Sequence, residues 1–202
     1  MQRNAKFDYF QKKMKNIAIF ASGSGTNAEN LIRFFRTSQF GKVRIVLSNR
    51  PDAGVLDRAQ SLEVESFVFT REQFYNSEEV LNLLFERDIN YIVLAGFLWL
   101  VPDNLLLPFD NKIVNIHPAL LPKYGGKGMY GSRVHRAVIE AGESESGITI
   151  HHVNQEYDEG DIIFQASCKI EPGETPDSLA EKIHELEYTY FPAVVESLLN
   201  KL

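Results

Sequence analysis

The first 117 residues alternate short apolar runs with segments in which apolar residues recur at helical spacing. Five runs have the length and composition of buried strands, and they lie at Met14–Ser22, Lys42–Ser48, Ser66–Phe69, Tyr91–Ala95 and Lys112–His117. Helical segments separate them, at Asn27–Thr37, Ala53–Leu62, Ser77–Arg87 and Val101–Leu107. Strands and helices that alternate in this way form a parallel sheet with right-handed crossover connections.

The pattern changes after His117. The segment Pro118–Ser132 contains two prolines and four glycines, so we expect a loop there. A helix is predicted over Ser132–Gly142. Two alternating runs, Gly147–Val153 and Asp161–Ile170, are typical of antiparallel strands.

A long helix is predicted over Pro176–Leu199, with a kink or a split at Pro192. Its expected apolar face contains Leu179, Ile183, Leu186 and Tyr190. The predicted fold class is therefore α/β: a Rossmann-like, doubly wound, mostly parallel sheet with a C-terminal antiparallel extension and a closing helix.

The composition is that of one globular domain. Hydrophobic residues make up 44% of the 202 residues and charged residues 24%. The 21 basic and 27 acidic residues give a net charge of −6, which argues against non-specific binding to nucleic acid or to an anionic membrane. Cys168 is the single cysteine, so an internal disulfide and a cysteine-rich zinc site are both excluded.

The same features predict where the protein works. No apolar run approaches the roughly 18 residues of a membrane span, and residues 1–13 lack the apolar core of a signal peptide. We therefore expect a reducing compartment, the cytoplasm. Residues 1–14 are interpreted as an extension of unknown role, and residues 15–202 as the single domain.

A glycine-rich segment, Gly23-Ser24-Gly25-Thr26-Asn27, follows the first predicted strand and opens the first helix. Glycines allow close backbone approach, and free N–H groups at a helix start attract phosphate. The Walker A ending is absent, and a dinucleotide fingerprint fits only loosely. A dinucleotide site would use Arg50 for a 2′-phosphate, and a plain tight turn is a further alternative. We favour a phosphate site of open identity.

Asn115 and His117 alternate at the end of a predicted strand, so their side chains share one face. An amide donor beside an imidazole suits acyl transfer, because the amide stabilises an oxyanion and the imidazole moves a proton. The alternative is a strand end bonded to loop backbone. Asp158 lies in the predicted loop between the two late strands, and a carboxylate beside His117 would favour the protonated imidazole. Acidic residues are also common in turns.

Other catalytic motifs are missing from the sequence. It contains no G-x-S-x-G nucleophile elbow and no H-E-x-x-H zinc motif. His151 and His152 are adjacent on a predicted strand and face opposite ways, which argues against joint metal binding. His151 is the one more suited to face the site, although both suit structural roles. We predict no metal.

Four blocks together resemble a known family: GSGTN at Gly23–Asn27, VLAGFLWLVP at Val93–Pro102, NIHPALLPKY at Asn115–Tyr124 and YDEGDIIFQ at Tyr157–Gln165. They are similar to the folate-dependent formyltransferases, and within them to the phosphoribosylglycinamide formyltransferases of purine synthesis. The resemblance extends from about Lys15 to the C-terminus. It implies a nucleotide-binding half at 15–117 and a folate-site half at 118–202.

The resemblance implies a reaction and its catalytic residues. The amine of glycinamide ribonucleotide would attack the formyl group of 10-formyltetrahydrofolate, the co-substrate, through a tetrahedral intermediate. Asn115 would donate to the oxyanion, His117 would be the general acid, and Asp158 would hold His117 and raise its pKa. The implied partners are these small molecules alone, and we expect a monomer or a homodimer.

The resemblance also implies the binding residues. Gly25, Thr26 and Asn27 match the ribonucleotide-phosphate loop. Glu187 matches the carboxylate that holds the substrate amine, although its sequence position alone favours a solvated helix face. The folate-binding residues implied are Arg71, Leu98, Trp99, Leu100, Val101, Asn115, Asn154, Gln155, Glu156 and Tyr157.

Two features depart from the family pattern. Trp99 replaces a common Arg or Lys, and the loop Gly125–Arg133 is longer than expected. Three other functions compete with the transferase. A formyltetrahydrofolate deformylase would add an N-terminal domain, which residues 1–13 are too short to supply. A methionyl-tRNA formyltransferase would add a C-terminal domain and suit a less acidic chain. A non-catalytic module could bind NADP.

Overall fold

The computed structural model describes residues 14–202, and residues 1–13, which make up most of the predicted extension, lie outside the described residues. In this described part of the chain, seven strands form one sheet in the order β3-β2-β1-β4-β5-β6-β7. Their bounds are β1 Lys15–Phe20, β2 Gly41–Ser48, β3 Glu65–Val68, β4 Ile89–Leu94, β5 Ile113–His117, β6 Glu145–His152 and β7 Ile162–Lys169. The first five are parallel, whereas β6 and β7 pair antiparallel, which confirms the predicted α/β sheet.

Within residues 14–202, seven helices cover the sheet. They are α1 Thr26–Phe35, α2 Gly54–Ser61, α3 Arg71–Tyr75, α4 Glu79–Glu86, α5 Asp103–Leu106, α6 Ser132–Glu140 and α7 Pro176–Leu199. Helices α1, α2, α6 and α7 pack in one hydrophobic cluster, and α3, α4 and α5 in another. Alternate residues of β1 contribute to each cluster, Ile17 and Ile19 to the first and Ala18 and Phe20 to the second. This two-sided burial explains why the parallel strands are apolar without alternation.

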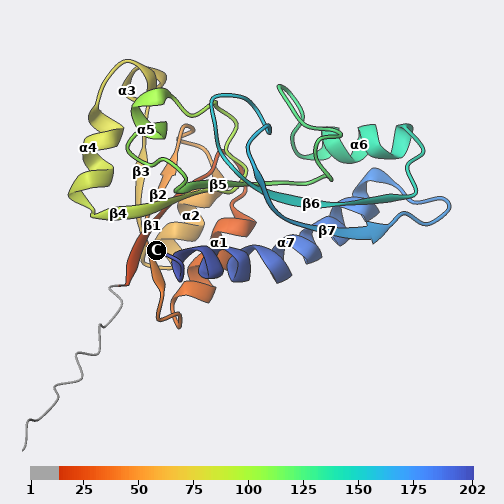
Figure 1. Ribbon diagram of the computed structural model, residues 1–202, viewed down its shortest axis with the longest axis horizontal. Coiled ribbons are helices and arrows are strands. Elements are labelled where there is room, and N and C mark those ends of the chain that lie inside the picture. The colour runs from red at the N-terminus through yellow and green to blue at the C-terminus, as the bar shows by residue number, and fades with distance from the viewer. Residues whose placement is uncertain (1–13) are drawn as a thin grey trace, which may run out of the picture.

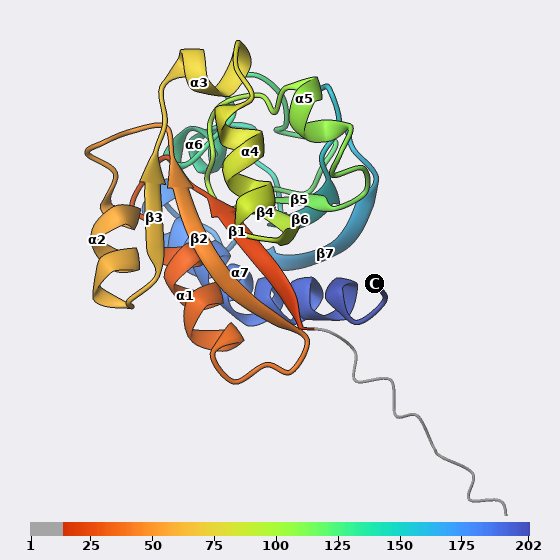
Figure 2. The same ribbon diagram turned by 90° about the vertical axis from the view of Figure 1, so that its left-hand side faces the viewer.

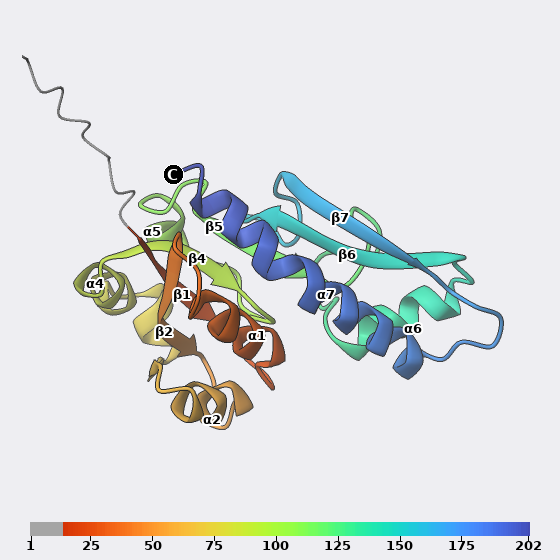
Figure 3. The same cartoon turned by 90° about the horizontal axis from the view of Figure 1, so that it is seen from below.

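The long β6–β7 pair extends away from the end of the molecule that carries α3, α4 and α5 (Figure 1). Viewed from the side, α3 and α4 are separated from α1 by the parallel strands (Figure 2). Helix α7 runs along the molecule from α6 to the start of β1 (Figure 3). There the Lys15 ammonium donates to the Leu202 carbonyl across 3.4 Å.

Helix α7 is continuous through Pro192, so the predicted split is wrong. A proline cannot donate to the carbonyl four residues earlier, which belongs here to Tyr188. That carbonyl accepts a hydrogen bond from Asn30 Nδ2 of α1 at 3.0 Å instead. The neighbouring helix therefore satisfies the group that Pro192 leaves free.

The predicted apolar face of α7 is partly wrong. Leu179 and Ile183 are buried and Leu186 is half-buried, but Tyr190 is 37% exposed and its ring packs against Phe164 of β7. The buried residues recur every four positions, at Leu179, Ile183, Glu187, Phe191, Val195 and Leu199. The face includes an acidic residue, which no hydrophobicity pattern selects.

One helix was not predicted from the sequence. Helix α3 has only five residues, too few to show a period. Its start has a capping box, in which the Thr70 hydroxyl accepts from the Gln73 backbone N–H and the Gln73 side chain accepts from the Thr70 N–H. The Thr-x-x-Gln pattern was the available signal.

Gly147 allows β6 to approach its neighbours closely. A Cβ atom at Gly147 would lie 2.0 Å from the Ala166 carbonyl oxygen of β7 and 2.7 Å from Leu120 Cδ2. We expect Gly147→Ala to lower the free energy of unfolding by about 2–3 kcal/mol, because the two strands must separate. Gly23→Ala is the control, since its Cβ would meet nothing within 4 Å, and we expect a change within about 0.5 kcal/mol. Urea unfolding measures both, and equal stability of the two variants would contradict the close approach.

Candidate active site

A cavity of about 490 Å³ opens where the parallel strands β1, β4 and β5 end. This is the edge at which open α/β sheets bind ligands. The wall is built from the turns after these three strands, the β5–α6 loop, the β6–β7 loop and the facing side of α7. Its lining includes Gly23–Asn27, 95–98, Asn115–Pro118, His135, Asp158, His184 and Glu187.

The glycine-rich segment forms one end of this cavity. Gly25 has a left-handed backbone with φ 79°, and a Cβ there would lie 2.5 Å from Val55 of α2. The Val55 N–H also donates to the Gly23 carbonyl at 3.1 Å, which ties the turn to α2. Helix α1 begins at Thr26, so its first N–H groups and its positive end face the cavity. This geometry suits a bound anion such as phosphate.

Asn115 and His117 both line the cavity, as their alternation on β5 predicts. The His117 ring is 3% exposed. Its Nε2–H donates to the Tyr124 carbonyl at 2.8 Å, because a carbonyl can only accept. Its Nδ1 lies 3.5 Å from Asp158 Oδ2. The structure therefore brings the three predicted catalytic residues together.

The expectation that Asp158 raises the pKa of His117 holds for the contribution of that carboxylate, although another effect sets the net shift. Burial lowers the pKa of His117 below its ordinary value, and this effect exceeds the opposing influence of the Asp158 carboxylate and the Tyr124 carbonyl. Burial alone would raise the pKa of Asp158. Contacts with His151, His117 and the Gly126 N–H, which donates at 2.9 Å, together keep the pKa of Asp158 below its usual range. The carboxylate is therefore charged at neutral pH.

His151 is a fourth member of this cluster. It is paired with Asn115 in the β5–β6 ladder and is buried. Its Nδ1–H donates to the His152 carbonyl at 2.8 Å, which leaves Nε2 to accept from Asn115 Nδ2 at 3.1 Å. The contact with His151 thus fixes the orientation of the Asn115 amide, with its Nδ2 group toward His151. The sequence indicated that His151 could face the site, but its partner became visible only through the strand register.

Glu187 is 6% exposed and faces the cavity from α7. The solvated helix face suggested by its sequence position is therefore wrong. Its Oε2 accepts from Asn27 Nδ2 at 2.7 Å, which joins α7 to the start of α1. Burial raises the pKa of Glu187, and the hydrogen bond from Asn27 and the charge of His184 offset only part of that effect.

The implied folate-binding residues divide between several places. Leu98 lines the main cavity. A smaller adjoining cleft is lined by Trp99, Leu100, Val101, Glu156 and Tyr157 together with Asn115, His151 and Asp158. The Tyr75 hydroxyl donates to the Leu100 carbonyl at 2.9 Å and holds this wall.

Three of these residues lie beside the smaller cleft. Asn154 and Gln155 line a neighbouring cleft that shares Val153 and Glu156 with it, and Gln155 Nε2 donates to Asp103 Oδ1 at 2.9 Å. The Arg71 guanidinium stacks on the rings of Tyr75, 4.7 Å from its centroid, and Trp99, at 5.6 Å. The unusual Trp99 therefore gives Arg71 a flat surface at the rim of the smaller cleft.

His135 was missed from the sequence. It lies on α6, is 3% exposed and lines the main cavity, and its Nδ1 is buried without a hydrogen-bond partner. Burial lowers the pKa of His135 to about 4, with smaller contributions from His184 and His117. The ring is therefore neutral at physiological pH. No sequence motif includes His135, and only the packing of α6 shows that it faces the cavity.

Other ligand classes find less support. The Arg50 guanidinium, the candidate for a 2′-phosphate, is paired with Asp52 at 2.8 Å. Within residues 14–202, no group of three His, Cys, Asp or Glu side chains is placed to hold a metal ion. In the same part of the chain, no helix combines the length and apolar character needed to cross a bilayer.

Comparison with known proteins gives the class of the chain. Residues 15–195 match the family described as Formyl transferase, so the chain belongs to that family of enzymes. The resemblance expected from the four sequence blocks is therefore confirmed.

More specific relatives share one name. Phosphoribosylglycinamide formyltransferase of Bacillus subtilis is 32% identical over 192 residues, which is 93% of this chain and 96% of that protein. The Haemophilus influenzae protein of the same name is 36% identical over 188 residues, 91% of this chain and 86% of that one. The crystal structure of glycinamide ribonucleotide transformylase 1 from Symbiobacterium toebii superposes with a TM-score of 0.86 at 32% identity, and covers 96% of this chain and 91% of that chain.

The buried His135 predicts a pH-dependent stability. Its pKa in the folded protein, about 4, lies below the value of about 6.5 expected in the unfolded chain. Its contribution to stability is therefore present above pH 6.5 and is lost as the pH falls toward 4. Between pH 7.5 and 4.5 the wild type should lose about 2–3 kcal/mol more unfolding free energy than His135→Gln. Urea unfolding at several pH values measures this, and parallel pH curves would contradict it.

Proposed function

We propose that this chain transfers the formyl group of 10-formyltetrahydrofolate to the amine of N1-(5-phosphoribosyl)glycinamide, a step of de novo purine synthesis. One observation carries the proposal most directly: Asn115, His117 and Asp158 converge in the cavity that also receives the start of α1. An acyl-transfer cluster therefore lies beside an anion site. Family membership and the shared name of the relatives support the same reaction.

The chemistry follows from that cluster. The substrate amine attacks the formyl carbon, a C–N bond forms, and the carbonyl oxygen becomes an oxyanion. Asn115 Nδ2 contacts His151 Nε2 at 3.1 Å and donates a long hydrogen bond of 3.4 Å to Asp158 Oδ1, and the hydrogen in this long bond turns to the oxyanion as it forms. His117 carries the proton lost by the amine to the folate nitrogen. The bond from that nitrogen to the formyl carbon then breaks and tetrahydrofolate leaves.

The two catalytic effects have characteristic sizes. One oxyanion donor typically contributes about 10²–10³-fold to the rate, and general acid–base catalysis about 10²–10⁴-fold. Asp158 remains charged beside His117, so it stabilises the imidazolium that forms during proton transfer. The buried state of His117 keeps water from competing for its proton.

The ribonucleotide spans the other end of the cavity. Its phosphate binds the N–H groups at the start of α1, with Gly25, Thr26 and Asn27 around it. Its amine lies against Glu187, which Asn27 holds in place at 2.7 Å. Because burial raises the pKa of Glu187, this carboxylate accepts a proton more readily than an exposed one, which favours the neutral amine needed for attack.

The folate occupies the smaller cleft beside Asn115 and Asp158, where Trp99, Leu100, Val101 and Tyr157 form the walls. Arg71, stacked on Trp99 at its rim, is placed to meet a carboxylate of the folate tail. Asn154 and Gln155 line the neighbouring cleft, which shares Val153 and Glu156 with this one. Both substrates are small molecules, and the reaction takes place in the cytoplasm.

A formyl-transfer assay with 10-formyltetrahydrofolate, run with and without glycinamide ribonucleotide, tests the proposal. We expect tetrahydrofolate to form only when the ribonucleotide is present. Product without ribonucleotide would indicate hydrolysis of the formyl folate. No product in either reaction, with the protein shown to be folded by circular dichroism, would favour another amine acceptor or a binding module.

His117→Ala should lower kcat by about 10²–10⁴-fold, because no other side chain in the cluster can take over proton transfer at that position. The dissociation constant for the ribonucleotide, measured by calorimetry, should change less than about twofold. His152→Ala is the control, because His152 lines a different cleft and should leave kcat near wild type. A nearly unchanged kcat in His117→Ala would refute its role.

Thr26→Val should weaken ribonucleotide binding about tenfold, because the hydroxyl beside the α1 start no longer bonds the charged phosphate. The rate at saturating ribonucleotide and the affinity for folate should stay close to wild type. Thr37→Val, at an exposed turn residue just beyond the end of α1, is the matched control. If the ribonucleotide affinities of both variants equal that of the wild type, the phosphate site lies elsewhere.

A further inference from the structure

The turn at Tyr124–Gly126 contacts both His117 and Asp158. The Tyr124 carbonyl accepts from His117 Nε2 at 2.8 Å, and the Gly126 N–H donates to Asp158 Oδ2 at 2.9 Å. We propose that Tyr124, anchored through its hydroxyl to Glu143, is a positioning residue that sets the orientation and protonation of His117. This inference deepens the reaction proposed above and rests on it.

His117 is placed between two acceptors. Its Nε2 faces the Tyr124 carbonyl and its Nδ1 faces the Asp158 carboxylate. A neutral imidazole has only one N–H, so it can donate to one of them, whereas the imidazolium can donate to both. The Nδ1–Oδ2 distance of 3.5 Å is longer than a hydrogen bond, which agrees with a neutral ring whose proton is on Nε2. The position of the Tyr124 carbonyl therefore selects the tautomer and favours the charged form.

The Tyr124 backbone does not hold that position by itself. Its φ is 57°, in the left-handed region that non-glycine residues avoid. The side chain supplies the restraint: its hydroxyl donates to Glu143 Oε1 at 2.8 Å, and the Lys123 ammonium donates to the same oxygen at 2.8 Å. Those two donors keep the pKa of Glu143 below its ordinary value, so the acceptor stays charged. Without this anchor the peptide is free to relax and to turn its carbonyl away from His117.

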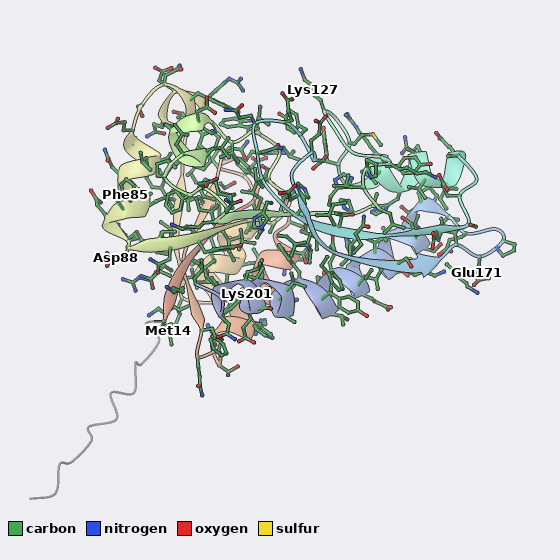
Figure 4. All side chains as sticks on the ribbon, viewed as in Figure 1. Met14, Phe85, Asp88, Lys127, Glu171 and Lys201 are labelled. Atoms are coloured by element: carbon green, nitrogen blue, oxygen red, sulfur yellow. The ribbon has the colours of Figure 1, made fainter. Side chains whose placement is uncertain are left out.

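The turn also packs tightly against Asp158. A Cβ at Gly125 would lie 2.6 Å from Leu121 Cδ2 and 3.2 Å from Asp158 Cβ. Beyond the turn, the loop passes along the cavity toward α6, and Lys127 extends outward from its tip (Figure 4). A shift of Tyr124 is therefore transmitted to both partners of the proton-transfer pair.

Three other titratable groups face the His117 ring. They are Asp158 from the β6–β7 loop, His151 from β6 and His135 from α6. None of them contacts the Tyr124 hydroxyl or Glu143. Loss of the anchor should therefore remove the influence of the Tyr124 carbonyl, which raises the pKa of His117, and leave the other three in place.

The test uses the full-length protein with Tyr124→Phe, which keeps the ring and removes the hydroxyl. We expect kcat to fall about fivefold, in line with the loss of one hydrogen bond, and KM for the ribonucleotide to stay within about twofold. The alkaline limb of the kcat–pH profile should move to lower pH, because His117 gives up its proton more easily. Tyr190→Phe is the control for removal of a tyrosine hydroxyl, because Tyr190 is partly exposed and its ring packs on Phe164 of β7.

Two substitutions at Glu143 provide a second, independent arm. Glu143→Ala removes the acceptor and should reproduce the effects of Tyr124→Phe, and the double variant should be no slower than either single one. Glu143→Gln retains an oxygen for the Tyr124 hydroxyl and should restore kcat to within about twofold of wild type. An unrestored rate in Glu143→Gln, or additive losses in the double variant, would overturn the anchoring role.

Ring ¹⁵N NMR of histidine-labelled protein gives a readout independent of activity. The His117 signals, assigned with His117→Gln, should show the Nε2–H tautomer in the wild type, and Tyr124→Phe should show a mixed tautomer and a lower pKa. A lower melting temperature with unchanged His117 signals and unchanged pH profile would overturn the proposal and leave Tyr124 a structural role. A wild type without formyl transfer would overturn the proposed function instead, whereas the NMR comparison would still decide the positioning.

Discussion

The antiparallel pairing of β5 with β6 is the contact on which the site depends. It places His151 of β6 opposite Asn115 of β5, and Thr149 opposite His117. The other neighbour of β5 is β4, and that pairing is parallel. Because β6 runs back along β5, His152 lies opposite Val114 and the Val153 N–H donates to the Ile113 carbonyl at 3.0 Å. The β6–β7 loop therefore starts beside the amino end of β5 and returns to place Asp158 in the cavity. A parallel neighbour would need a helical crossover connection and would not give this pairing of residues. The same pairing fixes the start of the loop after β5, because the buried Thr149 hydroxyl donates to the Ala119 carbonyl at 2.7 Å and accepts from the Leu121 N–H at 2.9 Å.

In the cavity, burial shifts the pKa of each group toward its neutral form, whereas nearby opposite charges and hydrogen bonds favour the ionised form. Which of these effects is larger differs between residues. Burial prevails at His117, His135 and Glu187, which are all shifted toward their neutral forms. Hydrogen-bond donors prevail at Asp158, which stays charged. At neutral pH the Asp158 carboxylate is therefore charged, whereas the His117 and His135 rings are neutral. This arrangement suits a reaction in which a proton must move while an oxyanion forms, because fixed donors stabilise the charge where it develops.

Local sequence encodes most of the strands and helices, whereas contacts between separate elements decide other features of the fold. The strands and the longer helices were predicted within a few residues, because their periods are visible in the chain. Helix α3 was missed because five residues show no period. Pro192 lies inside a continuous helix because Asn30 of another helix bonds the free carbonyl, a compensation no local pattern reveals. The exposed Tyr190 was assigned to the core because aromatic character outweighed the spacing of four that α7 follows.

The sequence by itself determined the alternating sheet, the glycine turn that only a residue without a side chain can form at Gly25, and the pairing of Asn115 with His117 on one strand face. These follow from backbone conformation and from the two-residue period of a strand, which are local properties. Tertiary structure decided the rest: the burial of Glu187 against Asn27, the partnership of His151 with Asn115, and the neutral state of His117. Each of these depends on atoms far apart in the chain, since burial and hydrogen bonding arise only when separate elements meet and exclude water.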